Sequence, residues 1–158
     1  MFRSAIRSVT RAQPLLRRTY ADAVNPDVLT LSLTLPHESL IVKQQVQQVN
    51  VPAASGEIGI LANHVPIVEE LKPGVVEIVE SPSKTSQYFI SGGLVTVLPG
   101  SQLSINAIEA YALDSFSIEA IKSQLSEAQK NLTSADEAIA AEAAIEVEVL
   151  EALQQVAK

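Results

Sequence analysis

Few residues of this chain could support catalysis. It contains no cysteine and only two histidines, His37 and His64, so neither a thiolate nucleophile nor a cysteine-based zinc site can form. Neither a GxxxxGK[ST] phosphate loop nor an HExxH zinc helix is present. Ser91 lies in a Ser-Gly-Gly sequence rather than in a GxSxG nucleophile elbow, and no histidine follows it. The adjacent acids Glu69 and Glu70 are more typical of a solvated edge than of an acid/base pair. These residues argue against an independent enzyme, and we expect no cofactor and no metal.

One acidic residue stands between two glycines in the stretch around which the chain is organised, residues 55–76. Gly56 and Gly59 enclose Glu57 and Ile58. Glycine tolerates positive φ and lets another backbone come close, so this spacing predicts a tight loop that presents the Glu57 carboxylate. A plain solvated loop acid is the alternative interpretation.

The same stretch continues through a corner and a turn. Val65 precedes Pro66, which favours extended geometry at the valine, and His64 beside them could be a hydrogen-bonded corner residue or part of an interaction site. Pro73 and Gly74 fit the two central positions of a type II turn. The stretch therefore predicts a strand, a corner and a second strand.

Charge divides the chain into two unequal parts. Residues 1–20 hold five arginines and no acid, whereas residues 21–158 hold six lysines and eighteen acids, a formal charge of −12. Nucleic acid is an unsuitable partner for that acidic part, because binding depends on cationic contacts to phosphate. The basic, Ser-containing segment is typical of a mitochondrial transit peptide, with processing near Tyr20 and Ala21. A basic helix on a membrane surface is the alternative.

Residues 28–113 follow a β pattern after a short lead-in at 21–27. Leucines at 29, 31, 33 and 35 alternate with Thr and Ser, which is the period of a half-buried strand. Further short apolar runs are separated by turn residues; one of these runs is expected to end at Pro52. Gly92 and Gly93 mark either a hairpin or a close backbone approach. Many short strands at this spacing predict an antiparallel β-sandwich of about ten strands.

The period changes to that of a helix in residues 114–158. Ile118, Ile121, Leu125, Ala128 and Leu132 recur at steps of three and four, and Ser115 or Ser117 could cap this helix. A capping box formed by Ser134 and Glu137 is predicted to open a second helix that runs to about Val156. Its expected apolar face consists of Ala138, Ala141, Ile145, Val149, Leu153 and Val156. We predict an antiparallel two-helix hairpin that needs a neighbouring surface for stability.

Four motifs in fixed order resemble one known family. These are GEIGIL, NHVP and LKPG within residues 56–74, followed by SGG at residues 91–93. Together they are similar to the small rotor subunit of F-type ATP synthases, called delta in mitochondria and epsilon in bacteria. The resemblance covers residues 29–158, and Ala62 matches mitochondrial members better than bacterial ones.

The resemblance implies a non-catalytic rotor component of the central stalk, on the matrix side of the mitochondrial inner membrane. Its implied partners are the c-ring, the gamma subunit and the small mitochondrial epsilon subunit, with one copy in each complex. Membrane contact would pass only through the c-ring, and no nucleic acid is involved. The implied c-ring and gamma interface comprises Gly56, Glu57, Ile58, Gly59 and His64. The chain would stiffen the junction through which proton-driven rotation drives ATP synthesis.

A second function is suggested by bacterial relatives that bind ATP on the helical hairpin through an [IL]DxxRA motif and inhibit ATP hydrolysis. The matching residues are 118–123, where Glu119, Lys122 and Ser123 replace Asp, Arg and Ala. Lysine cannot reproduce the planar fork of arginine. Nucleotide sensing is therefore the alternative to the rotor function, and we expect weak ATP binding or none.

Overall fold

The computed structural model describes residues 27–157. The predicted transit segment at 1–20, its processing site at Tyr20 and Ala21, and the lead-in up to residue 26 lie outside the described residues. Within the described part, ten strands are followed by a short 3-10 turn, Leu113–Ser115, and by two helices. The predicted order of an antiparallel β-sandwich and a helical hairpin is therefore confirmed.

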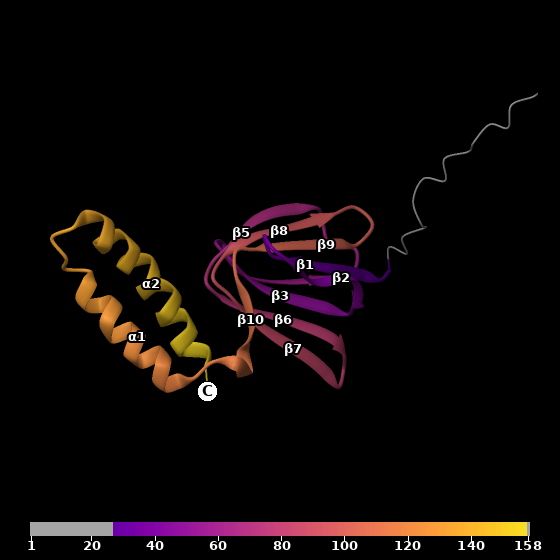
Figure 1. The fold of residues 1–158 in the computed structure, drawn as a ribbon. Coiled ribbons are helices and arrows are strands. Elements are labelled where there is room, and N and C mark those ends of the chain that lie inside the picture. The colour runs from indigo at the N-terminus through magenta and orange to yellow at the C-terminus, as the bar shows by residue number, and fades with distance from the viewer. Residues whose placement is uncertain (1–26, 158) are drawn as a thin grey trace, which may run out of the picture.

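The ten strands pair in one continuous path, β10-β7-β6-β3-β5-β8-β9-β1-β2, with β4 added on β3. Between β3 and β5 only Ala53 pairs with Leu71, so the sheet folds over at this point into two layers (Figure 1). All pairs are antiparallel except β1 with β9, which run parallel. The strands are β1 Leu29–Thr34, β2 Ser39–Val46, β3 Gln48–Ala53, β4 Gly56–Leu61, β5 Ile67–Leu71, β6 Gly74–Ser81, β7 Lys84–Ile90, β8 Gly93–Leu98, β9 Gln102–Ala107 and β10 Ala110–Ala112.

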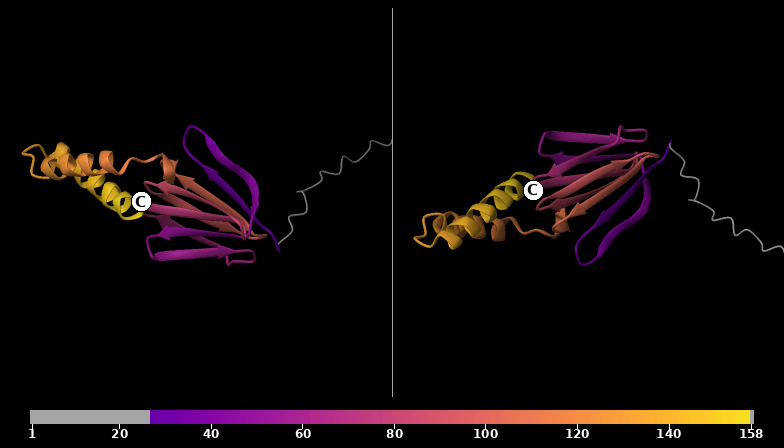
Figure 2. Two further views of the ribbon diagram at one scale, coloured as in Figure 1. Left: turned by 90° about the horizontal axis from the view of Figure 1, so that it is seen from below. Right: turned by 90° about the horizontal axis from the view of Figure 1, so that it is seen from above.

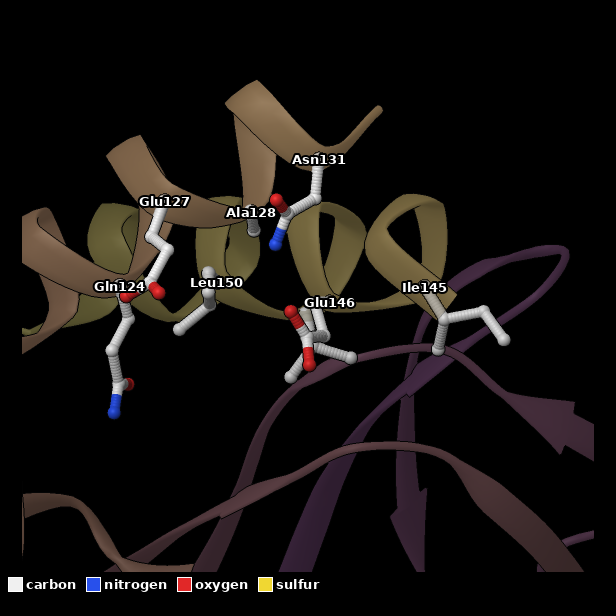
Figure 3. Close-up of a pocket in the computed structure, with 8 residues that line it drawn as sticks. Gln124, Glu127, Ala128, Asn131, Ile145, Glu146 and Leu150 are labelled. Carbon is white, nitrogen blue, oxygen red and sulfur yellow. The ribbon is translucent and has the colours of Figure 1, made fainter. Parts of the chain in front are cut away.

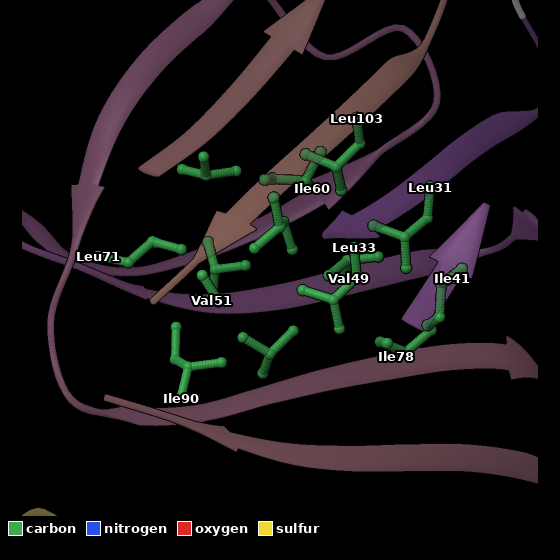
Figure 4. Packing of buried hydrophobic residues seen from close by; sticks show 14 of the residues in the cluster. Leu31, Leu33, Ile41, Val49, Val51, Ile60, Leu71, Ile78, Ile90 and Leu103 are labelled. Atoms are coloured by element: carbon green, nitrogen blue, oxygen red, sulfur yellow. The ribbon is translucent and has the colours of Figure 1, made fainter. Parts of the chain in front are cut away.

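Aliphatic side chains from both layers meet in one core (Figure 4). Leu29, Leu31 and Leu33 of β1 are fully buried, and the Thr and Ser residues between them face outward. This alternation follows from the two-residue period of a strand with one face on the core. The core also contains Val49, Val51, Ile60, Ile78, Ile90, Val95, Leu103 and Ile105.

Two positions that were predicted to end a strand or form a turn have other roles. β3 continues through Pro52 to Ala53, so the proline does not end the strand. Gly74 starts β6 and is not among the residues with positive φ, so the predicted type II turn at Pro73 and Gly74 is wrong. A Cβ at Gly74 would lie 2.9 Å from the Pro52 side chain. Glycine is needed here because two strands pack closely, not because of backbone conformation.

The Ser-Gly-Gly sequence marks a close backbone approach, one of its two predicted roles. Gly93 has a φ of +153°, and a Cβ there would lie 2.3 Å from the carbonyl oxygen of Asn106. Gly92 has a φ of +147° and lies against the Leu71 carbonyl. Two glycines therefore let β8 start directly beside β9 while the chain turns out of β7.

The helices are α1, Ile118–Asn131, and α2, Glu137–Val156. Of the two predicted caps, Ser117 is the one that caps α1, by accepting a hydrogen bond from the Ala120 amide. The predicted capping box of α2 is wrong, because Asp136 is its N-cap and accepts from the Ala138 amide at 3.0 Å. Ser134, two residues before Asp136, instead accepts a hydrogen bond from the Asp136 amide at 3.2 Å. The aspartate sits one residue before the helix, where its carboxylate also meets the positive end of the helix dipole.

The buried face of α2 differs from the predicted stripe. Leu153 is buried as expected, but Ala138 and Ala141 are exposed and Ile145 is 66% exposed. Ala143, outside the predicted stripe, is buried instead. Alanine and aliphatic residues occur all around this helix, so the sequence period does not show which face is buried. The packing of α2 against α1 determines which face is buried.

The hairpin contacts the sandwich only at its base and extends away from it (Figures 1 and 2). Phe89 of β7, Ile121 of α1 and Leu153 of α2 are buried together there. Phe116 lies edge-on to Phe89, with ring centroids 5.8 Å apart, and edge-on to Tyr111 at 6.1 Å. This junction cluster supplies the neighbouring surface that the hairpin needs, and it leaves the far half of the hairpin uncovered by the sandwich.

Candidate functional site

The predicted Glu57 loop is a strand. Residues 56–61 form β4, which pairs along its whole length with β3 and places Glu57 opposite Pro52. The turn lies at Ala54 and Ser55, and Gly56 just after it has a φ of +132°. Glu57 is still exposed, but it projects from a hydrogen-bonded edge strand rather than from a loop.

Glycine is required at position 59 by neighbouring side chains and not by the backbone conformation. Its φ is not positive, and a Cβ there would lie 3.2 Å from Asn50 Oδ1 and 3.4 Å from Gln48 Nε2. Gln48 donates to Asn50 Oδ1 at 2.7 Å, and Asn50 Nδ2 donates to Glu77 Oε2 at 2.7 Å. The glycine therefore leaves room for this polar network on the outer face of β4, β3 and β6.

His64 lies at the other end of β4 from Glu57. A strand of six residues spans roughly 17–20 Å, so the predicted interface residues do not form one compact site. The neighbouring Asn63 has a φ of 61°, and its amide donates to Ser101 Oγ at 2.7 Å. His64 Nδ1 lies 2.8 Å from the Val65 carbonyl oxygen. This corner is tied to the β8–β9 turn, and Glu57 belongs to the opposite end of the sheet.

The outer face of β1, β5, β8 and β9 is almost free of charge, a feature that sequence reasoning missed. Its exposed apolar residues are Val68, Leu94 and Leu98, which are 64%, 42% and 45% exposed. Around them the strand registers align hydroxyl and amide side chains in rows. Glu70 is the one charged residue that these four strands place on this face, and Lys43 of β2 borders it beside Ser32. We call it the uncharged face; its residues are Thr30, Ser32, Thr34, Val68, Glu70, Leu94, Thr96, Leu98, Gln102, Ser104 and Asn106.

A sheet face with so little charge is unusual for a surface exposed only to water, because charged residues are depleted at the centre of protein interfaces and common elsewhere. Thr34 Oγ1 donates to Asn106 Oδ1 at 2.7 Å, so neighbouring polar groups on this face partly satisfy each other. The sequence of β1 already indicated a face with little charge. The residues between the leucines of β1 are Thr and Ser without any Lys or Glu, which a purely solvated face would normally carry.

Residues 118–123, on which the nucleotide-sensing alternative depends, lie on the first turns of α1, beside the sandwich. Ile121 is buried in the junction cluster. Two hollows adjoin this helix, and within the described structure no Lys, Arg or His lines either one. Phosphate groups need cationic partners or clustered backbone amides. The lining therefore gives no support to ATP binding.

We expect the chain from residue 21 to bind ATP no more tightly than the millimolar range, because no cation among the described residues faces these hollows. Calorimetric titration measures this directly. A variant carrying Glu119→Asp, Lys122→Arg and Ser123→Ala restores the bacterial motif and provides the comparison. Saturable binding by the unmodified chain at micromolar ATP would contradict the expectation and favour the regulatory alternative.

Within residues 27–157 there is no group of three or more His, Cys, Asp or Glu side chains that could hold a metal ion. No helix in the same part of the chain is long and apolar enough to cross a membrane. The same part of the chain has three exposed features available for contact with other proteins: a sheet face with little charge, the edge strand that carries Glu57, and the projecting hairpin.

Comparison with known proteins identifies the family. The family of ATP synthase delta/epsilon chain β-sandwich domains matches residues 28–112. The C-terminal domain of the fungal epsilon subunit of F1F0-ATP synthase matches residues 116–155. The mitochondrial ATP synthase delta subunit of Pichia angusta is 62% identical over 156 residues, covering 98% of both chains. That of Saccharomyces cerevisiae is 54% identical over 161 residues and covers both chains completely.

Solved structures show the same architecture. A chain in the mitochondrial ATP synthase OSCP/F1/c-ring structure of Euglena gracilis matches with a TM-score of 0.77 and 31% identity, covering 87% of this chain and 86% of that one. A chain in the central stalk/c-ring structure of Tetrahymena thermophila mitochondrial ATP synthase shares the fold, with a TM-score of 0.58 and 15% identity. The chain belongs to the delta/epsilon family of ATP synthase subunits, and within it to the mitochondrial delta subunits.

Proposed function

We propose that this chain is a non-catalytic rotor component of the central stalk of mitochondrial ATP synthase. It links the c-ring to the gamma subunit and couples proton-driven rotation to ATP synthesis without contributing a catalytic group. The uncharged face is the observation that carries this proposal, because a sheet face with little charge and several exposed apolar residues, on an otherwise acidic protein, is suited to contact with another protein. The delta-subunit relatives and the Euglena assembly support the same role.

The uncharged face is proposed to contact gamma. Its three apolar residues lie on two adjacent strands, β5 and β8, and hydroxyl and amide groups surround them on β9 and β1. This is the arrangement of an apolar centre with a polar rim that protein interfaces use. His64, three residues before β5, is assigned to the border of this contact. A rigid sheet suits a rotor, since torque must pass through the contact without deforming it.

The Glu57 end of β4 is proposed to contact the c-ring. This end lies on an edge strand with one partner, β3, and includes Gly56, Glu57, Ile58 and Gly59. The Glu57 carboxylate can fix the orientation of the contact through hydrogen bonds to polar loops.

The hairpin is proposed to contact the small mitochondrial epsilon subunit. One copy would be present in each complex, on the matrix side of the inner membrane, with membrane contact only through the c-ring.

Glu57→Ala tests the c-ring contact. We expect the variant to fold normally and to weaken c-ring retention by at most about fivefold, because an exposed charge pair contributes about 0–1 kcal/mol. The measurement is c-ring retention in the isolated complex, together with ATP hydrolysis that is uncoupled from proton pumping. Glu38→Ala, which removes an exposed acid from the β1–β2 turn, is the matched control. The assignment is wrong if the two variants behave alike or if Glu57→Ala unfolds the chain.

A further inference from the structure

A cavity of about 540 Å³ lies where the helical hairpin meets β7 and β10. A volume of this size can hold a small organic molecule, and sites for such molecules often lie between domains. Strands contribute one wall of the cavity, and α1 and α2 contribute the other. We call it the junction cavity; its lining includes Ser91, Glu109, Phe116, Ala120, Val149 and Leu150.

The strand wall presents a serine and a glutamate side by side. β10 pairs with β7 so that Ala110 lies opposite Ile90, and both are buried in the sandwich core. The next pair along the ladder is Ser91 and Glu109, and the Ser91 amide donates to the Glu109 carbonyl oxygen at 3.3 Å. Successive side chains of a strand point to opposite faces. Ser91 and Glu109 therefore point away from the core and into the junction cavity.

The Ser91 hydroxyl is a buried polar group without a partner. Its oxygen is shielded from solvent and makes no hydrogen bond with any described residue. Buried polar groups in folded proteins almost always have a hydrogen-bond partner, and an unpaired one lowers stability. Because Ser91 lines the junction cavity, a molecule bound there can supply the missing hydrogen bond.

Glu109 places a carboxylate beside this hydroxyl. Its Oε2 accepts a hydrogen bond from the Tyr111 hydroxyl at 2.7 Å, and that bond raises the pKa of the Tyr111 phenol. Tyr111 therefore stays a neutral donor that orients the carboxylate, while Oε1 can accept from a ligand. No Lys, Arg or His of the described chain lines the cavity to neutralise Glu109. The polar end of the cavity consequently favours a positively charged hydrogen-bond donor.

The remaining lining of the junction cavity is largely apolar and aromatic. Phe116 lies edge-on to Phe89, with ring centroids 5.8 Å apart, and both rings line the cavity. Val149 and Leu150 of α2 line it as well. Such a lining can bury an apolar body, and aromatic rings also attract cations.

The surroundings of the cavity also attract cations. A second hollow, about 530 Å³, adjoins it at Val149 and Leu150. Glu127 and Glu146 border that hollow (Figure 3). Residues 117–157 carry eight acids against two lysines, so the hairpin is negatively charged. A field of this sign raises the local concentration of cations and lowers that of anions.

We propose that the junction cavity binds small organic cations, namely protonated amines attached to an aromatic or aliphatic body. The ammonium group donates to Glu109 and to the Ser91 hydroxyl, and the apolar body lies against Phe116, Val149 and Leu150. An anionic ligand such as a nucleotide does not suit this site, because its phosphates would face the Glu109 carboxylate. Since strands and helices both line the cavity, a bound amine also holds the hairpin against the sandwich.

NMR titration of the isotope-labelled chain from residue 21 tests the site without any other subunit. The probes are phenethylamine, phenethyl alcohol and phenylpropionate, which share one aromatic body and differ in charge at neutral pH. We expect the amine to shift the amide signals of Ser91, Glu109 and Leu150 saturably, with a dissociation constant of about 1 mM or below. The alcohol should bind about two- to fivefold more weakly, and the carboxylate should not bind measurably. Equal binding of amine and alcohol, or no saturable shift by the amine, overturns the proposal.

Glu109→Gln tests the charged contact. The glutamine keeps an acceptor for Tyr111 and removes the charge, so we expect the amine to bind about two- to fivefold more weakly and the alcohol to bind as before. Glu119→Gln is the matched control, because Glu119 is an exposed acid on the first turn of α1 and does not line the cavity. An equal loss of amine binding in both variants would show a general effect of the field and would overturn the proposal.

Ala120→Leu tests the location by filling the cavity from α1. Ala120 lines the cavity, and leucine is also a good helix former. We expect at least about tenfold weaker binding of phenethylamine, because the ligand must compete with the added side chain for space. Ala138→Leu, at an exposed alanine of α2 outside the cavity, is the control. Unchanged binding by Ala120→Leu overturns the proposal; if its unfolding midpoint in urea falls, the comparison of Glu109→Gln with Glu119→Gln decides instead.

Discussion

Gly93→Ala is expected to destabilise this protein more than any other single methyl addition considered for its glycines. The new Cβ would lie 2.3 Å from the Asn106 carbonyl oxygen and 2.8 Å from the Ala107 Cα, both on the backbone of β9. Neither atom can move aside as a side chain would. The φ of +153° adds strain of about 1–3 kcal/mol, and the forced separation of β8 from β9 adds about 1–3 kcal/mol. The total, roughly 2–6 kcal/mol, approaches the whole stability of many domains.

Urea unfolding of the chain from residue 21 measures this loss as a lowered midpoint. Gly56→Ala is the matched control, because Gly56 also has a positive φ, +132°, but a Cβ there meets nothing within 4 Å. The control therefore carries the conformational strain without the collision, at about 1–3 kcal/mol. Equal midpoints for the two variants would mean that backbone contact between β8 and β9 is not what requires glycine at position 93.

Thr96→Arg is expected to abolish stable incorporation of the chain into the central stalk while leaving its fold intact. Thr96 lies at the middle of the uncharged face, between Val68 of β5 and Ser104 of β9. In the isolated chain a long arginine can extend into water, so its unfolding midpoint should change little. Against a partner surface the same charge is buried without a counter-ion, which costs about 2–5 kcal/mol. That range corresponds to a loss of affinity of roughly 30-fold to several thousandfold.

The measurement is the ratio of this chain to gamma in the purified complex, compared with urea unfolding of the isolated variant. Thr85→Arg is the control, because Thr85 is an exposed threonine on β7 in the other layer. Normal incorporation of Thr96→Arg would show that the uncharged face does not contact gamma. Loss of incorporation by both variants would point to a general effect of added charge.

The sequence alone determined the class of fold and its order. The alternation of Leu29, Leu31 and Leu33 with Thr and Ser predicts the strand that forms, because a strand with one face on a core must alternate. The stripe of Ile121, Leu125 and Ala128 predicts the buried face of α1 for the corresponding reason at helical period. Patterns of this kind are local, and the residues themselves carry them.

The sequence did not determine how elements meet, and the wrong predictions at Gly59, at Gly74 and on the buried face of α2 have this cause. Gly59 and Gly74 look like turn residues, yet they are glycine because Asn50 and Pro52 of the neighbouring strand β3 occupy the space. Alanines and aliphatics surround α2, so only its packing on α1 decides that Ala143 is buried and Ile145 is exposed. The uncharged face exists only once the strand registers align the hairpin of β8 and β9 with β5 and with β1, which begins more than sixty residues before that hairpin. Tertiary structure decided these features because they depend on which atoms come together, and a local pattern does not contain that information.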